Sequence, residues 1–286
     1  MWDSLELRRR QRRRSLYRWL LSMPAVLPLL FFTGENVAAL NTIFVGQSAE
    51  QSGGIAEEFY RNFIEGGRYM WLLDGLLLTL FMSAMAALIG MIIGLILSVI
   101  RVSYRAGVRI PILNALAGAY IAVIRGTPVM VQLLIIYFSI FGNLTDIPPV
   151  LVAGLAFGIN SGGYMAEIFR AGIESIGVGQ TEAGRSLGLS YGQTMRRIIL
   201  PQAIRNVLPT MFNEFITLLK ETSVAGFIAV DDLTRAGNNI RSKTWSNQPL
   251  YAVALIYLVL VLGLTRLLSV LEKRMRRSDR RATGTD

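Results

Sequence analysis

The run GLLLTLFMSAMAALIGMIIGLILSVI, residues 75–100, constrains the fold of this chain more than any other feature. It is longer than the roughly 20 apolar residues that a helix needs to cross a bilayer. Inside lipid a backbone has to satisfy its own hydrogen bonds, so an isolated run of this kind must be an α-helix. Because 52% of the residues are hydrophobic and the mean hydropathy is +0.46, the sequence predicts an all-α integral membrane protein.

Five further apolar runs bring the expected number of transmembrane helices to about six. They lie at residues 19–32, 111–141, 150–169, 207–230 and 250–268. The run 111–141 is expected to be one interrupted element, because Gly126 and Pro128 disfavour a continuous helix. The run 19–32 follows a basic stretch, as the apolar part of a signal peptide does. We expect a retained span bent by its two prolines; a signal anchor and a cleaved signal are the alternatives.

Small residues suggest where two of these helices meet. Gly90 and Gly94 stand four positions apart in the run 75–100. In membranes such a pair lets a second helix approach closely. The alternative is that both glycines are merely tolerated in lipid.

The placement of basic residues predicts the orientation. Most of the 29 Lys and Arg residues fall in four segments that six spans would place on one side, residues 1–18, 101–110, 170–206 and 266–286. Because cytoplasmic loops carry the excess of Lys and Arg, both termini and residues 173–206 are expected in the cytoplasm. No nucleic-acid partner is expected, since the basic residues flank membrane spans.

The absence of two residue types excludes much chemistry. The chain contains no cysteine and no histidine. Disulfides, Cys or His metal sites and catalysis by a histidine base are therefore excluded. The dipeptide Gly-Lys of a phosphate-binding loop is also missing, so ATP would have to bind to another subunit. We expect no cofactor, no metal and no catalytic residue; a membrane-embedded enzyme that uses carboxylates is the alternative.

One segment between the apolar runs is polar, TEAGRSLGLSYGQTMRRIILPQ at residues 181–202. A first short helix around Gln180–Leu187 should end at Gly188. Ser190 and Gln193 have the spacing of a capping box that begins a second helix, and Pro201 is expected to end it. Helices this short are not stable alone in water, so a partner surface is expected to hold them. The alternative is an ordinary capped loop.

This segment resembles the "EAA" loop of the permease subunits of ATP-binding-cassette importers. The matching residues are Glu182, Ala183, Gly184, Gly188, Ile198, Leu200 and Pro201. The one departure from the motif is glycine in place of alanine at position 184. Four further stretches, residues 125–133, 160–176, 186–190 and 218–223, resemble permeases for polar amino acids such as histidine, glutamate, glutamine, arginine and opines.

The resemblance covers about residues 72–275 and implies a fold. It implies a five-helix type I importer permease core, to which the chain adds one N-terminal helix. The expected regions are a basic cytoplasmic tail and first transmembrane helix (1–33), an extracytoplasmic loop with a short helix near 55–64 (34–71), the permease core with its coupling loop 173–206 (72–275), and a cytoplasmic tail (276–286).

The resemblance also implies partners. These are two ATPase subunits that bind ATP and Mg, a second permease subunit in a homodimer or heterodimer, and an extracytoplasmic binding protein that captures the amino acid. The location implied is the bacterial cytoplasmic (inner) membrane, with lipid around the spans. Glu182, Ala183 and Gly184 would contact the ATPase, and Gly188 would shape the turn. The alternatives are another solute class, such as a sugar or an ion, and a stand-alone channel or carrier.

Polar side chains within the apolar runs are the candidates for a substrate path, because burying them in a membrane is costly. The candidates are Arg125, Thr127, Asn160, Ser161, Tyr164, Glu167, Lys220 and Glu221. Glu214 is a further ionisable residue within a run. Structural alternatives stay open: Glu167 stands three positions before Arg170 and can pair with it, and Lys220 and Glu221 can pair with a neighbouring helix.

Overall fold

The computed structural model describes residues 54–144 and 146–283, and all regular elements in these ranges are helical. The chain divides into two compact units, residues 1–60 and 61–286. The first unit enters the described part only with α3 (Ile55–Phe59) and the start of the π-helical turn η1 (Tyr60–Ile64). These two elements confirm the short helix predicted near 55–64. The predicted span 19–32 lies outside the described residues.

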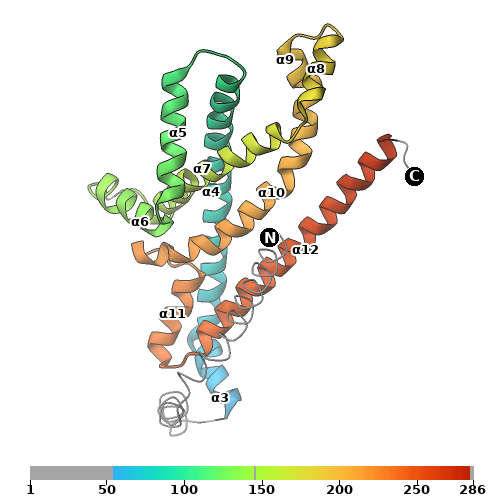
Figure 1. Cartoon of the computed structure of the whole chain (residues 1–286). Helices are drawn as coiled ribbons and strands as arrows, with labels where there is room; N and C mark the ends of the chain where they lie inside the picture. Colours follow the sequence, from blue (N-terminus) through green and yellow to red (C-terminus); the bar gives the residue numbers. More distant parts are fainter. Residues whose placement is uncertain (1–53, 145, 284–286) are drawn as a thin grey trace, which may run out of the picture. The chain divides into compact units, whose positions relative to one another are not determined.

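The second unit contains nine α-helices among its described residues (Figure 1). They are α4 (Arg68–Arg105), α5 (Pro111–Gly126), α6 (Val129–Leu134), α7 (Pro149–Glu174), α8 (Val178–Ser186), α9 (Tyr191–Thr194), α10 (Leu200–Glu221), α11 (Leu233–Thr244) and α12 (Gln248–Thr283). Shorter helical turns join some of them: η2 (Glu65–Gly67), η3 (Ile135–Ile140), η4 (Met195–Ile199) and η5 (Thr222–Ile228). In Figure 1, α8 and α9 lie at one end of this unit and α11 at the other.

Three described helical segments are long and apolar enough to cross a membrane, namely Glu57–Arg105, Pro149–Glu174 and Gln248–Lys273. They contain the predicted spans 75–100, 150–169 and 250–268. A fourth span results if α5 and the segment Val129–Ile140 form one broken crossing. The predicted span 207–230 is not among them, because α10 carries polar residues along its length and gives way to the 3₁₀ turn η5. The described residues therefore supply three or four of the expected six spans.

Helices α4 and α7 pack against each other closely through their glycines. A Cβ atom added at Gly90 would lie 2.7 Å from Cβ of Ser161, and one at Gly94 would lie 2.8 Å from the backbone nitrogen of Ala166. From the other side, a Cβ atom at Gly158 would lie 2.6 Å from Cβ of Ile89. Such separations are too short for real side chains, so these positions accept no larger residue without movement. The close helix contact predicted at Gly90 and Gly94 is confirmed.

The break in the element 111–141 occurs where the sequence predicts it. Helix α5 ends at Gly126, Thr127 and Pro128 are extended, and the chain turns by 109° into α6. The buried amide of Gln132 satisfies the backbone that the break leaves open. Its Nε2 lies 2.8 Å from the Ile124 carbonyl oxygen and 3.1 Å from that of Thr127. A polar side chain thus takes the place of the missing helical hydrogen bonds.

Pro201 does not end the second helix of the polar segment, and that prediction is wrong. The chain continues helically from α9 through the π-helical turn η4 into α10, with Pro201 in the first turn of α10. Proline is tolerated in a first turn, where its missing N–H costs little. The wider π turn just before Pro201 shifts the hydrogen-bond register there. As a result, α9 and α10 form one continuous helical connection.

Candidate functional site

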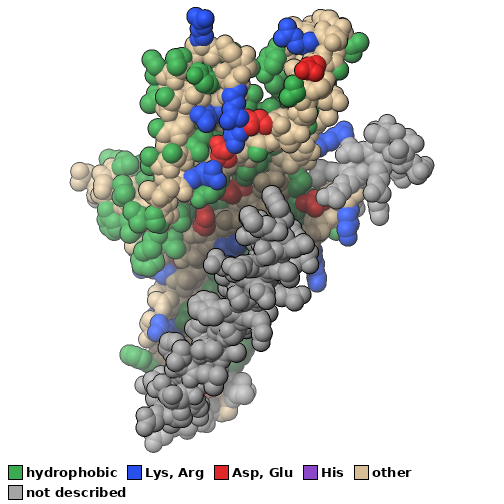
Figure 2. All heavy atoms as spheres, in the orientation of Figure 1, with side chains coloured by type: hydrophobic (Ala, Val, Ile, Leu, Met, Phe, Trp, Pro, Cys, Tyr) green, Lys and Arg blue, Asp and Glu red, His purple; other side chains and the backbone are tan. Residues whose placement is uncertain are grey.

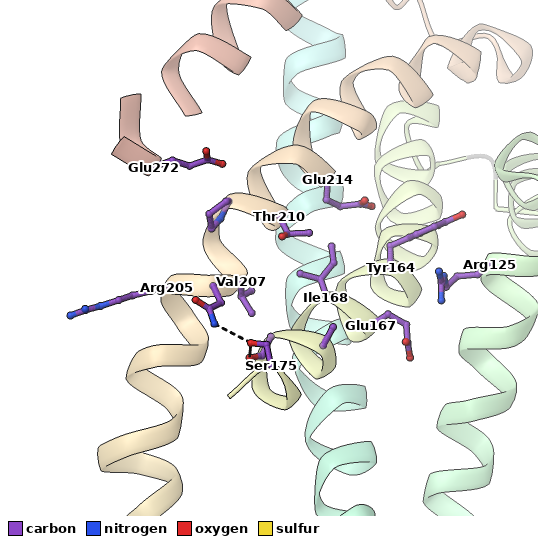
Figure 3. Close-up of a pocket in the computed structure, with 14 residues that line it drawn as sticks. Arg125, Tyr164, Glu167, Ile168, Ser175, Arg205, Val207, Thr210, Glu214 and Glu272 are labelled. Atoms are coloured by element: carbon purple, nitrogen blue, oxygen red, sulfur yellow. Dashed lines mark hydrogen bonds between the residues drawn. The ribbon is translucent and has the colours of Figure 1, made fainter. Parts of the chain in front are cut away.

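A cavity of about 820 Å³ lies between α5, α7, α10 and α12 (Figure 3). It is lined by Arg125, Tyr164, Glu167, Ile168, Ala171, Gly172, Ser175, Arg205, Asn206, Val207, Pro209, Thr210, Glu214 and Glu272. Figure 2 shows acidic and basic side chains gathered in the region between α5 and α10, with hydrophobic side chains over α5 and α6 beside them. Charged groups among otherwise apolar membrane helices are the default candidates for a functional site.

Glu214 is the acidic residue that α10 places at the cavity. Its side chain is half-buried, and its Oε1 accepts a hydrogen bond of 3.3 Å from the hydroxyl of Ser161 on α7. Within the described part of the chain, no Lys or Arg nitrogen lies within ion-pair distance of this carboxylate. A carboxylate without a protein counter-ion is suited to bind a cation that enters the cavity.

Arg125 is the basic residue that the end of α5 places at the cavity. Its guanidinium lies 5.5 Å from the centroid of the Tyr164 ring, within range of a cation–π contact. The ion pairs found among the described residues do not include Arg125. The guanidinium is therefore in contact with a ring and makes no close ion pair with a described residue, so it can receive a carboxylate.

Glu167 is the third predicted path residue that lines the cavity, but it already has a partner. Its Oε2 lies 2.6 Å from Nη2 of Arg170, which confirms the predicted i, i+3 pair. Arg170 also binds Glu174 at 2.5 Å, and Glu174 binds Arg105 at the end of α4. This network of ion pairs joins the ends of α4 and α7. The main contacts of Glu167 are therefore those of a residue that pairs with Arg170, which is the alternative to a role in the substrate path.

The other predicted path residues lie away from the cavity lining. Asn160 is buried, and its Nδ2 donates to Oε1 of Gln132 at 2.9 Å, while Nε2 of Gln132 lies 2.7 Å from Oγ1 of Thr127. Asn160 and Thr127 thus hold the side chain of Gln132, which stabilises the break between α5 and α6. Lys220 is exposed and Glu221 half-buried at the end of α10.

The residues of the EAA-like segment separate into a packed set and an exposed set. Gly184 is buried, and a Cβ atom there would lie 2.6 Å from Cγ2 of Thr194 and 3.1 Å from Cδ1 of Ile198. Glycine at this position therefore lets α8 lie directly on α9 and η4. Glu182 and Ala183 are exposed on the outer side of α8, and Leu200 and Pro201 are exposed at the start of α10.

The turn between α8 and α9 has the predicted geometry. Gly188 has φ of +80°, in the left-handed region that favours glycine. Ser190 and Gln193 form the predicted capping box: the Ser190 N–H donates to Oε1 of Gln193 at 2.9 Å, and the Gln193 N–H donates to Oγ of Ser190 at 3.3 Å. The apolar side chain of Leu187, at this turn, is 80% exposed, and that of Val178, at the start of α8, is 72% exposed.

Sequence reasoning missed several of these residues. It noted Glu214 as ionisable without placing it in the path, and it did not single out Thr210 or Asn206, although all three are polar residues on one helix. They stand four positions apart, and residues four apart lie on the same face of a helix, so the spacing could have shown that they share one face of α10. Leu187 and Val178 gave a signal too, as apolar residues in a polar segment.

Comparison with known proteins identifies relatives that cover more than half of this chain. Residues 102–277 match the family described as binding-protein-dependent transport system inner membrane component. The chain is 38% identical over 212 residues to an arginine transport system permease protein of Bacillus subtilis, covering 73% of this chain and 94% of the relative. It is 42% identical over 168 residues to a glutamine transport system permease protein of Escherichia coli K12, covering 58% and 77%.

Solved structures show the same fold. A crystal structure of an amino acid ABC transporter with histidines superposes with a TM-score of 0.68 at 40% identity, covering 74% of this chain and 98% of the other. The inward-facing MetNI methionine ABC transporter superposes with a TM-score of 0.63 at 22% identity, covering 72% and 97%. The second similarity concerns the fold alone.

Proposed function

This chain belongs to the family of binding-protein-dependent transport system inner membrane components, and on this premise we propose that it is the permease subunit of an importer for polar amino acids. The observation that carries the proposal is the cavity that Glu214 and Arg125 share. A free amino acid has an ammonium and a carboxylate, and these two side chains offer the complementary charges. The arginine, glutamine and amino acid transporters among the relatives support the same substrate class.

In the proposed site each charged residue has a separate role. The Glu214 carboxylate, oriented by Ser161, binds the ammonium group of the amino acid. Arg125, held against Tyr164, binds its carboxylate. Thr210 lies on the same helix as Glu214 and lines the cavity with it (Figure 3). Asn206, also on α10, lines the cavity too, and both residues supply groups for hydrogen bonds.

Coupling to ATP hydrolysis is proposed to run through α8 and α9. The exposed side chains of Leu187 and Val178 give a partner an apolar contact, and Glu182 lies exposed on the same helix as Val178. Because η4 joins α9 to α10 without a break, a displacement of α9 moves the helix that carries Glu214. In this proposal ATP and Mg are bound by two separate ATPase subunits.

The remaining assembly follows from the same proposal. The end with α8 and α9 faces the cytoplasm, as do both termini, and the end with α11 faces outward. A second permease subunit completes the path across the inner membrane. An extracytoplasmic binding protein delivers the amino acid to the outward end.

Reconstitution tests this function. The permease, with the ATPase and binding protein encoded beside it, is placed in proteoliposomes, and uptake of radiolabelled arginine, glutamine, histidine and glutamate is measured with ATP inside. We expect uptake of at least one of them that requires ATP and the binding protein. Uptake without the ATPase, or uptake of a sugar or an inorganic ion alone, would contradict the proposal.

A substitution at the turn between α8 and α9 tests the proposed coupling to ATP hydrolysis. Gly188→Val should uncouple ATP hydrolysis from uptake, because valine does not tolerate the positive φ at this turn. Gly107→Val is the matched control, since Gly107 also has a positive φ (93°) and an added Cβ atom meets nothing within 4 Å, but it lies in the loop between α4 and α5. Normal uptake by Gly188→Val would argue against coupling through this turn.

A further inference from the structure

Trp245 is an exposed aromatic residue in an unusual backbone conformation. It follows the last residue of α11, and its side chain is 92% exposed. Its φ of 54° and ψ of 26° place it in the left-handed region, where a bulky side chain is a rare outlier. The chain thus displays a large apolar surface in a conformation that glycine or asparagine would adopt more easily.

The residues on both sides of Trp245 are firmly held. Thr244 and Ser246 are buried, and the Thr244 hydroxyl donates to the Ile240 carbonyl oxygen at 3.0 Å. Asn62 is fully buried, and its Nδ2 donates to Oγ of Ser246 at 3.0 Å. The backbone that carries the indole is therefore already ordered, and no loop-ordering cost is added when a partner binds it.

The surroundings of Trp245 are those of a water-exposed surface. The last two turns of α11 expose Asn238, Arg241, Ser242 and Lys243, and Asn247 follows directly after Ser246. A hollow of about 550 Å³ lies beside this helix, lined by Trp71, Asp74, Leu78, Asp231, Ala236, Asn239, Ser242 and Lys243. Two of the lining residues contact each other, since Nζ of Lys243 lies 4.3 Å from the centroid of the Trp71 ring. Hydrocarbon does not suit a surface with this density of charge.

We propose that Trp245 is the anchor residue through which the extracytoplasmic binding protein docks onto this permease, with the charged hollow beside α11 forming part of the polar rim. The inference rests on the proposed function, which places α11 at the outward end and requires a soluble partner there. The family to which the chain belongs is itself defined by dependence on a binding protein. Protein interfaces concentrate their binding energy in a few aromatic and arginine residues surrounded by polar ones, and tryptophan is prominent among them.

The first test varies the concentration of the binding protein. In proteoliposomes with the full complex, the ATPase activity is measured as the amino-acid-loaded binding protein is added. Trp245→Ala should raise the concentration needed for half-maximal stimulation by about tenfold or more, as loss of an interface anchor does. The maximal stimulation and the basal rate should stay unchanged. Trp245→Phe should lie between the wild type and Trp245→Ala.

The same titration of ATPase activity with loaded binding protein includes a matched control variant. Tyr251→Ala removes an aromatic side chain that is 65% exposed on α12 and should leave the titration unchanged. A Trp245→Ala curve that superposes on the wild-type curve overturns the inference. If the wild type is not stimulated by any loaded binding protein, the proposed function itself fails, so the two failures are distinguishable.

A second test locates Trp245 directly and does not depend on transport. The chain contains no cysteine, so Trp245→Cys gives a single site for an environment-sensitive bimane label. Addition of the binding protein should shift the label emission to the blue and protect it from iodide. A label that is already shielded in proteoliposomes without the binding protein, by lipid, by a second permease or by residues 1–53, overturns the inference.

Discussion

The hydroxyl of Ser161 on α7 donates a hydrogen bond of 3.3 Å to Oε1 of Glu214 on α10. Ser161 itself is fully buried, and Gly90 of α4 lies directly behind it, where an added Cβ atom would be 2.7 Å from the serine Oγ. The close packing of α4 on α7 therefore fixes the donor that orients the cavity carboxylate. The packing of α4 on α7 therefore also determines how the Glu214 carboxylate on α10 is oriented.

Glu214→Gln should weaken amino-acid uptake, because it removes the charge opposite the substrate ammonium. The KM for uptake should rise about tenfold or more, the size expected when a hydrogen bond to a charged group is lost. Uptake kinetics in proteoliposomes measure the effect. Glu65→Gln serves as the control, since Glu65 is an exposed carboxylate paired with Arg68. An unchanged KM for Glu214→Gln would remove this residue from the site.

Gly90→Val should separate α4 from α7 and lower the unfolding temperature in detergent. Overpacking a tight core contact typically costs about 1–3 kcal/mol. Gly263→Val on α12 is the matched control, because a Cβ atom at Gly263 meets nothing within 4 Å. Equal unfolding temperatures for the two variants would show that α4 and α7 are packed too loosely at Gly90 for a side chain to disturb them.

Gly184→Ala should impair coupling even though it restores the alanine of the EAA motif. The new Cβ atom would lie 2.6 Å from Cγ2 of Thr194, so α8 would be pushed away from α9. In the double variant Gly184→Ala, Thr194→Ala the obstructing methyl group is gone, and ATP-driven uptake should recover in part. Additive losses in this double-mutant cycle would mean that residues 184 and 194 act independently.

Gln132→Leu should destabilise the permease without touching the cavity. The substitution leaves the carbonyl oxygens of Ile124 and Thr127 without their donor, and the buried one, that of Ile124, should cost about 1–3 kcal/mol. Thermal unfolding in detergent reports the loss. Gln202→Leu, at an exposed glutamine of α10, is the control. A Gln132→Leu protein as stable as this control would refute the role of the amide in the break.

Asp232→Ala should lower stability, and Asp232→Asn, which keeps one of the two acceptor oxygens, should lower it less. The Asp232 carboxylate caps α11 by accepting hydrogen bonds from the Thr234 N–H at 3.0 Å and the Arg235 N–H at 3.2 Å. Burial raises the pKa of Asp232, so the site disfavours the charge but still needs an acceptor oxygen. Loss of such a cap costs about 1 kcal/mol. Thermal unfolding of both variants checks the expected order.

Local signals in the sequence predicted local structure well. The capping box at Ser190 and Gln193, the positive φ at Gly188 and the break after Gly126 all depend on residues within a few positions of each other. Pro201 shows the limit of such reasoning: the proline rule holds for a regular helix, and the π turn ahead of it changed the register to which the rule applies. The span predicted at 207–230 is not among the helical segments that are apolar enough to cross a membrane. The reason is that α10 exposes a polar face to the cavity.

By itself the sequence determined that this chain is helical and membrane-embedded, because apolar run length and backbone hydrogen bonding leave lipid-embedded segments few choices. It also determined the EAA-like segment, whose turn and cap are encoded in consecutive residues. Only the tertiary structure decided which polar side chains share the cavity. Asn160 and Ser161 are neighbours on α7, yet one supports the α5–α6 break and the other orients Glu214. Which way each points depends on the helix packed against it, and that contact is formed between residues far apart in the chain.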